Sequence, residues 1–271
     1  MGITLGMEKA FKQRLMNKKL IHAITNAVTM RDMANAILAV GGSPMMADSP
    51  LEIEEITELV DATVINLGML NASKEESIRM ILHATRSSIV LDPVGVTISS
   101  YRKKFAIECL KTGKISVLKG NRSEILALAG VDCASIGVDS LETQPHDLVI
   151  YTELAAKYQV IVVVTDKEDI ITDGINVAIV DNGSKMLKRI TGAGCMLGGI
   201  IGVMIAQNTN AFESVLCAVL MFDIASENAH SSVNGETLYG SFSLALFDAL
   251  GSIKLTDIIT SSRVTMSRVT R

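Results

Sequence analysis

The chain of 271 residues contains no tryptophan, and all aromatic side chains together make up only 4% of it. It also lacks an excess of positive charge, since 25 Lys and Arg stand against 29 Asp and Glu. A protein that binds nucleic acid typically needs a basic surface for the phosphates, and often aromatic rings for the bases. We therefore expect no nucleic-acid partner.

Cysteine and histidine are sparse, and their spacing matches no metal site. The four cysteines form no CxxC pattern, and the four histidines lie far apart in the sequence. The N-terminal residues are too charged for a secretory signal, so we expect thiols in a reducing cytoplasm. We interpret three of these as small core residues: Cys109, Cys133 and Cys217.

No stretch reads convincingly as a membrane span. Residues 190–212 carry no charge and are long enough to cross a bilayer, but they end in the polar run Gln207–Asn210. We predict a buried helix there and no membrane partner. Gly194, Gly198 and Gly202 recur every four residues, so they share one helix face and would let this helix lie close to a sheet or a neighbouring helix.

The two familiar nucleotide-binding patterns, GxxxxGK[ST] and GxGxxG, are absent, but another glycine motif is present. Thr191–Cys195 reads TGAGC and leads into the apolar run Met196–Ala206. A helix that begins at such a turn presents free N–H groups and a partial positive charge, which suit a phosphate. Asn182–Arg189 supplies cations nearby. The alternative is a tight turn entering a buried helix.

Short apolar runs alternate with helical patterns, which indicates one domain over residues 1–271 with a mostly parallel sheet and helices on both faces. The predicted strands are Leu20–Thr25, Ser43–Ala47, Thr63–Gly68, Ser88–Val94, Ile115–Lys119, Val160–Thr165, an antiparallel pair Asp169–Thr172 and Asn176–Val180, and Arg263–Val269. The predicted helices between them are Thr29–Val40, Leu51–Val60, Ser73–Thr85, Ser99–Lys111 and Leu148–Tyr158.

Polar residues follow five successive predicted strands, at the edge where parallel sheets bind ligands. They are Thr25-Asn26, Asn66-Leu67-Gly68, Asp92-Pro93-Val94-Gly95, Lys119-Gly120-Asn121 and Thr165-Asp166. Helix capping explains any one of them, but not all five. We expect Asp92 and Glu124, on adjacent loops, to hold Mg²⁺, and Lys119 with the helix near Thr191 to hold phosphates. Met45-Met46 are expected to line an apolar ligand pocket.

Six ordered motifs resemble those of the hydroxyethylthiazole kinase family, which has a ribokinase-like fold. They are ITNAV (24–28), GGSPMMA (41–47), INLGML (65–70), LDPVG (91–95), LKGNRSEI (118–125) and ITGAGC (190–195). The resemblance implies a three-layer α/β/α sandwich and ATP-dependent phosphorylation of 4-methyl-5-(2-hydroxyethyl)thiazole with Mg²⁺ in thiamin salvage. It also implies a homotrimer with the site at the subunit interface.

The resemblance assigns roles to individual residues. Asn121 and Glu124 match an NxxE element that organises Mg²⁺ and phosphate. The implied ATP-binding residues are Lys119, Thr165, Asn121 and Thr191. The implied substrate-binding residues are Met46, Gly192, Asn26, Val28, Gly68 and Cys195. The implied catalytic residues are Gly192, Ala193, Gly194 and Cys195.

Two segments depart from the family pattern. Leu238–Phe242 reads LYGSF where the family has Gly-Pro-Gly-Ser-Phe, and Ala134–His146 aligns poorly at the adenine end. Cys195 occupies a position where many related sugar kinases carry an aspartate base. A helix N-terminus should lower the pKa of this thiol, so we expect Cys195 to orient the alcohol and to accept its proton late. The alternative is a small residue at a tight turn.

Two other functions compete with this one. A hydroxymethylpyrimidine kinase or a nucleotide-repair dehydratase would share the glycine motif but typically carries Asp at the Cys195 position. A non-catalytic thiazole- or nucleotide-binding module is the second alternative, suggested by the departure near Tyr239.

Overall fold

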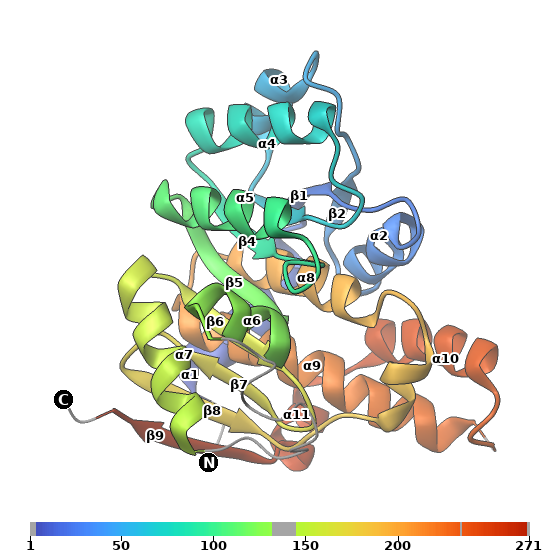
Figure 1. The fold of residues 1–271 in the computed structure, drawn as a ribbon. Helices are drawn as coiled ribbons and strands as arrows, with labels where there is room; N and C mark the ends of the chain where they lie inside the picture. The colour runs from blue at the N-terminus through green and yellow to red at the C-terminus, as the bar shows by residue number, and fades with distance from the viewer. Residues whose placement is uncertain (1–3, 132–144, 234, 270–271) are drawn as a thin grey trace.

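One mixed sheet of nine strands organises the molecule, in the order β2-β1-β3-β4-β5-β6-β7-β8-β9 (Figure 1). The computed structural model describes residues 4–131, 145–233 and 235–269. The strands are β1 (Leu20–Ile24), β2 (Ser43–Met45), β3 (Ala62–Asn66), β4 (Ser88–Asp92), β5 (Ile115–Asn121), β6 (Ile161–Thr165), β7 (Asp169–Thr172), β8 (Asn176–Val180) and β9 (Val264–Arg268). Strands β1 to β6 run parallel, and β7, β8 and β9 are antiparallel additions.

Helices cover both faces of this sheet, which confirms the predicted three-layer α/β/α arrangement with an antiparallel edge. The helices are α1 (Leu5–Met16), α2 (Met30–Ala39), α3 (Ile53–Leu59), α4 (Ala72–Ala84), α5 (Ser100–Lys111), α6 (Arg122–Ala129), α7 (Pro145–Tyr158), α8 (Ala193–Ile205), α9 (Ala211–Ser232), α10 (Tyr239–Ser252) and α11 (Leu255–Ser261), with a 3₁₀ helix η2 (Lys185–Arg189). Of the described residues, no helix is long and apolar enough to span a membrane.

The central strands are buried on both faces, since helices cover both sides of the sheet and neighbouring residues point to opposite sides. In β4, Val90 belongs to the apolar cluster that contains α8 and α9, while Ile89 and Leu91 belong to the cluster under α4 to α7. The continuous apolar runs of the sequence therefore reflect two separate cores. The described cysteines of these cores, Cys109 and Cys217, are buried free thiols, and Cys133 lies outside the described residues.

Helix α8 lies against the middle of the sheet because its glycines leave room for the strands. A Cβ atom at Gly202 would come within 2.9 Å of Val64 Cγ2, and one at Gly198 within 3.6 Å of Val64 Cγ1. The predicted helix in this region and its small-residue face are therefore confirmed, and its start at Ala193 agrees with the predicted start near Thr191.

The main differences from prediction occur where strands end near the candidate site. Strands β3 and β4 end at Asn66 and Asp92, two residues earlier than predicted. Pro93 has no N–H with which to extend β4, and Asn66 Oδ1 accepts the Gly68 N–H at 2.9 Å, which turns the chain away after β3. Residues 122–129, for which no helix was predicted, form α6.

Candidate active site

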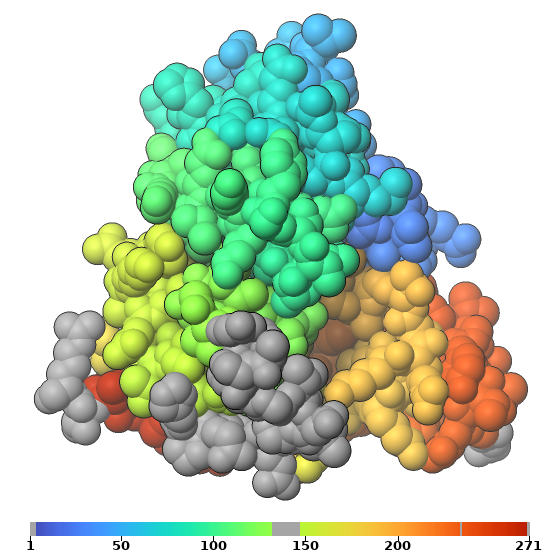
Figure 2. All heavy atoms as spheres, viewed as in Figure 1, coloured from blue at the N-terminus to red at the C-terminus, as the bar shows by residue number. Residues whose placement is uncertain are grey.

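The carboxyl ends of the central parallel strands and the first turn of α8 enclose one cavity of about 560 Å³. In Figure 2 the surface is hollowed between the green segment that carries α5 and the golden segment that leads into α8. The cavity brings together most sequence-predicted site residues: Asn26, Val28, Gly68, Asp92, Lys119, Asn121, Glu124, Thr165, Thr191, Gly192, Gly194 and Cys195. Met46 and Ala193 are the two predicted residues that do not line it.

The glycine turn places the start of α8 at this cavity. Gly192 is the N-cap and has φ +86°, a conformation that favours glycine, and a Cβ there would lie 2.9 Å from Thr29 Cγ2. The first hydrogen bond of the helix runs from Met196 N–H to Gly192 O at 2.9 Å. The N–H groups of Ala193, Gly194 and Cys195 therefore precede the helical ladder and can bind an anion.

Cys195 lies in the first turn of α8 and is 8% exposed. Its Sγ accepts hydrogen bonds from Asn66 Nδ2 at 3.3 Å and Asn26 Nδ2 at 3.7 Å. Our expectation of a lowered thiol pKa was wrong: burial raises the pKa of Cys195, and the nearby Asp92 carboxylate adds to this effect. The neighbouring donors and Lys119 oppose the rise without overcoming it. The thiol therefore keeps its proton at neutral pH.

Asp92 and Lys119 form a buried ion pair rather than two independent groups. Lys119 Nζ lies 3.1 Å from Asp92 Oδ2, and both side chains are almost inaccessible to solvent. Burial raises the pKa of Asp92, although Lys119 and Asn66 favour its ionised form. Burial disfavours the charge of Lys119, but Asp92 and the neighbouring Cys195 and Glu124 outweigh this and raise the lysine pKa. Lys119 is therefore a cation whose charge is already largely balanced.

Glu124 lies in the first turn of α6 and not on a loop as expected. It forms a capping box with Asn121: Asn121 N–H donates to Glu124 Oε2 at 3.0 Å, and Glu124 N–H donates to Asn121 Oδ1 at 2.9 Å. The second carboxylate oxygen, Oε1, accepts the Gly95 N–H at 3.2 Å. Burial raises the pKa of Glu124, and Asp92 raises it further. The backbone thus fixes this carboxylate beside Asp92.

The two carboxyl groups fit a magnesium ion that shares its coordination with phosphate and water. Asp92 Oδ1 is buried and has no hydrogen-bond partner among the described residues. Burial raises the pKa of both Asp92 and Glu124, and a cation placed between them would offset this effect. No set of three or more His, Cys, Asp and Glu in the described ranges could hold a metal alone. Mg²⁺ typically binds through one or two carboxylates plus substrate phosphates, which this pair allows.

A second cavity of about 580 Å³ adjoins the first and shares Asn121, Thr165 and Gly194 with it. Ala193 lines this second cavity, as do the charged side chains of Asp169, Lys188 and Asp223. The lining of the two cavities together extends from the start of α8 to the residues before η2. The poorly matching segment 134–146, which includes the expected adenine end, lies largely outside the described residues.

Met46 follows the edge strand β2 and packs against the apolar core on the α8 side of the sheet. Neither Met45 nor Met46 lines the cavity of its own chain, and their expected place at an apolar ligand pocket stays a prediction. The departing segment at Leu238–Phe242 forms the N-cap and first turn of α10, and it lines neither cavity.

Sequence reasoning named Asn66 only as a polar residue at a strand end and assigned no role to Thr29 or Arg102, but the structure places all three at the site. Asn66 bridges the centre, since Nδ2 lies 3.0 Å from Asp92 Oδ2 and 3.3 Å from Cys195 Sγ. Thr29 and Arg102 also line the cavity. The place of Asn66 at the end of a strand beside Asp92 was the signal for it, whereas nothing in the local sequence marks Arg102, which lies in the first turn of α5.

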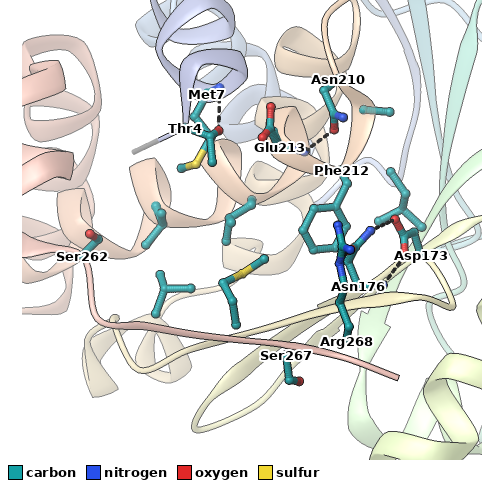
Figure 3. A pocket seen from close by; sticks show the side chains of 16 residues that line it. Thr4, Met7, Asp173, Asn176, Asn210, Phe212, Glu213, Ser262, Ser267 and Arg268 are labelled. Atoms are coloured by element: carbon teal, nitrogen blue, oxygen red, sulfur yellow. Dashed lines mark hydrogen bonds between the residues drawn. The ribbon is translucent and has the colours of Figure 1, made fainter. Parts of the chain in front are cut away.

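A larger cavity of about 710 Å³ lies at the opposite edge of the sheet, where β6 begins. Figure 3 shows Thr4, the N-cap of α1, with Met7 of α1, Phe212 and Glu213 of α9, and Arg268 of β9 around it. Its polar groups largely satisfy one another: Asn210 caps Glu213 N–H at 3.0 Å, and Arg268 Nε donates to Asn176 Oδ1 at 3.2 Å. None of the sequence-predicted site residues lines this cavity.

The fold is of the ribokinase-like class. A pyridoxal kinase from Staphylococcus aureus, solved with AMP-PCP and pyridoxal, shares the fold, with a TM-score of 0.62, 16% identity, and coverage of 93% of this chain and 99% of that one. At this identity the likeness concerns the fold alone.

The chain belongs to the hydroxyethylthiazole kinase family, whose sequence profile matches residues 11–256. It is 38% identical to the hydroxyethylthiazole kinase of Alkaliphilus metalliredigens over 237 residues, which covers 86% of each chain. The corresponding enzyme of Clostridium botulinum is 36% identical over 258 residues, or 92% of each chain. The structure of a hydroxyethylthiazole kinase from Pyrococcus horikoshii superposes with a TM-score of 0.85 at 33% identity and covers 96% of this chain and 98% of that one.

Proposed function

We propose that this protein transfers the γ-phosphoryl group of ATP to the primary alcohol of 4-methyl-5-(2-hydroxyethyl)thiazole, as a step of thiamin salvage. One observation carries the proposal: the free N–H groups at the start of α8 and the Asp92–Glu124 pair line the same cavity. An anion site facing two carboxylates suits phosphoryl transfer, which depends mainly on positioning and charge neutralisation. Family membership supports the thiazole alcohol as acceptor.

In the proposed reaction the alcohol oxygen forms a bond to the γ-phosphorus as the bond to the β–γ bridging oxygen breaks and ADP leaves. The N–H groups of Gly194 and Cys195 stabilise the charge on the transferred group. Cys195 positions the hydroxyl. Because its thiol remains protonated, the alcohol proton passes late to an oxygen of the transferred phosphoryl group and then to water. This replaces our expectation that Cys195 itself takes the proton.

Asp92 and Glu124 would hold Mg²⁺, which would supply positive charge that reduces the repulsion between the phosphate groups and the attacking oxygen. Asp92 contributes its unpartnered Oδ1. Lys119 limits the repulsion between the two carboxylates, and its ammonium lies next to Gly194, where a Cβ atom would approach Nζ to 2.9 Å. ATP would reach from this point into the second cavity past Thr165 and Asn121.

We further propose a homotrimer in which a neighbouring copy completes the thiazole site. Apolar side chains remain exposed at the mouth of the cavity, with Val28 66% and Met69 52% exposed. Met45, beside Met46 on the edge strand, is 37% exposed. Exposed apolar patches of this kind are typical of interfaces. The position of Met46 outside the cavity of its own chain is consistent with a contact made across the interface. A single domain and a cytoplasmic location remain our proposals.

A coupled assay of ADP release tests the proposed function. The purified protein is given ATP and Mg²⁺ with the thiazole alcohol, with hydroxymethylpyrimidine, or without an acceptor. We expect ADP release that depends on the thiazole alcohol, and a phosphomonoester of the thiazole in the product mixture. Release that depends on the pyrimidine alcohol would favour the first alternative, and no release with any acceptor would favour a binding module.

A further inference from the structure

The cavity at the start of α8 is lined by two cationic side chains that differ in how free they are. Lys119 is buried and paired with Asp92 at 3.1 Å. Arg102 lines the same cavity, is partly exposed, and has no carboxylate within ion-pair distance among the described residues. The lining acids Asp92 and Glu124 together with ATP bring several negative charges to this cavity. A second cation that is not already paired would offset part of this negative charge.

Arg102 is held at the edge of this cavity by the loop after β4. Its Nη1 donates to Val94 O at 3.3 Å, and the guanidinium lies over Gly95, where a Cβ would be only 2.4 Å from Nη1. Gly95 also has φ +83°, so both its backbone and the close approach of Arg102 require glycine. The N–H of the same Gly95 donates to Glu124 Oε1 at 3.2 Å. The side chains of Arg102 and Glu124 therefore both contact Gly95.

We propose that Arg102 is a catalytic residue that binds the terminal phosphate oxygens of ATP from the side of the cavity opposite α8. The inference rests on the proposed kinase function. A guanidinium presents a planar set of donors that can bind two phosphate oxygens at once, which an ammonium cannot do. A single weak hydrogen bond to a carbonyl leaves most of these donors free. The group therefore has both the charge and the free donors to follow the phosphoryl group through transfer.

The alternative is a structural role, in which Arg102 only braces the loop at residues 93–95. The two roles predict different behaviour. A brace affects folding and is not replaced by a free small cation, whereas a phosphate-binding guanidinium can be replaced in part by guanidinium ion in solution. The ratio of ATP to ADP affinity also distinguishes them, because only a contact to the terminal phosphate changes that ratio.

The test compares Arg102→Ala and Arg102→Lys with the parent enzyme, and uses Lys104→Ala, an exposed cation on the same helix, as the matched control. We expect Arg102→Ala to lower kcat about 100-fold or more, as the loss of a transition-state donor does. Arg102→Lys should recover only part of this loss, Lys104→Ala should match the parent, and millimolar guanidinium should raise the activity of Arg102→Ala several-fold. Binding of the thiazole alcohol should remain within about twofold.

Titration calorimetry with ATP and with ADP provides the second readout and does not need the acceptor. We expect Arg102→Ala to weaken the binding of ATP more than the binding of ADP. The ratio of the two affinities should change by about tenfold, because a charge-assisted contact to the terminal phosphate is lost. An unchanged ratio together with unrescued activity would overturn the proposal and leave the brace. If the parent does not phosphorylate the thiazole alcohol, the proposed function fails, and the ATP to ADP ratio still decides the role of Arg102.

Discussion

Asn66 connects the two groups whose protonation matters most, because its amide donates both to the Asp92 carboxylate and to the Cys195 sulfur. The donors to Cys195 would favour a thiolate, but burial and the Asp92 charge act in the opposite direction and prevail. The position of a thiol at a helix start thus does not decide its pKa. The carboxylate behind it and the loss of water matter more.

A neutral thiol that only positions the alcohol leads to a prediction about Cys195. Cys195→Ala should keep the fold and lower kcat by less than the roughly 100-fold loss that follows removal of a general base. Cys195→Asp should remain active or gain activity, because a carboxylate adds a proton acceptor at the same place. Steady-state kinetics with thermal unfolding as the control measures both. An Asp variant that folds but is inactive would count against an alcohol bound beside residue 195.

Glu124 gives a second prediction at this scale. Glu124→Gln removes the charge next to Asp92 while keeping a side chain of the same shape in the capping box. We expect the Mg²⁺ concentration for half-maximal activity to rise by about tenfold or more, as loss of a group near a metal ion does.

Binding of the thiazole alcohol to Glu124→Gln, measured by calorimetry, should be unchanged, and the exposed Glu76→Gln serves as the matched control. Collapse of thiazole affinity in Glu124→Gln would mean that this side chain contacts the acceptor instead.

At the scale of elements, the packing of β7 against α9 buries two acidic groups near one another. Burial raises the pKa of Asp169 to about 7 from 3.8, and the Asp166 N–H and Lys119 counteract this only in part. Burial likewise raises the pKa of Asp223, and Asp169 adds to it. Both carboxyl groups therefore keep their protons to a higher pH than an exposed carboxyl group does.

This arrangement predicts a pH dependence of stability. Since folded Asp169 retains a proton that the unfolded chain loses near pH 3.8, the free energy of unfolding should fall as the pH rises from there to about 7. Asp169→Asn should make this fall smaller, since Asp223 still contributes to it, and should gain up to about 4 kcal/mol at pH 8, at roughly 1.4 kcal/mol per pKa unit. Urea unfolding at several pH values measures it, with the exposed Asp248→Asn as control. A parallel pH dependence in both variants would contradict this account.

Regular elements were the part of the fold that the sequence predicted best. The strands Asp169–Thr172 and Asn176–Val180 were predicted with their observed bounds, because two apolar runs flank a turn where Asp173 Oδ1 accepts the N–H of Asn176 at 2.7 Å. Helix α6 was missed because its start is capped by Asn121 and Glu124, residues that we had interpreted as a ligand loop. The same two residues cap the helix and line the cavity, so the local pattern did not separate the roles.

The site itself was predicted mainly at strand ends, because parallel strands bring their carboxyl ends to one edge. The sequence could not predict which side chains pair with one another or how deeply each one is buried. The salt bridge of Lys119 with Asp92 and the raised thiol pKa arise from contacts between distant segments, and the place of Met46 outside the cavity depends on the edge position of β2.

At the scale of the whole molecule, the proposed trimer gives a prediction on mass and on shared sites. Light scattering should give three times the chain mass of 29.0 kDa. Leu51→Glu, at a side chain that is 96% exposed close to the Met45-Met46 segment in the chain, should lower that mass if this surface is buried between copies.

Mixing provides a sharper test of a shared site. Met46→Ala and Glu124→Gln should each be impaired alone, and mixed trimers should regain activity because some sites then draw both native residues from different copies. Mixtures with no more activity than the two variants alone, or a monomeric parent, would contradict a site completed by a neighbour.

The central claim is that the start of α8 binds the transferred phosphoryl group beside the Asp92–Glu124 pair. A crystal structure with ADP, Mg²⁺, aluminium fluoride and the thiazole alcohol tests it most directly. The account predicts a planar fluoride complex against the N–H groups of Gly194 and Cys195, with the metal next to Asp92 and Glu124. A fluoride complex bound elsewhere, or N–H groups at residues 193–195 that contact only protein, would contradict it.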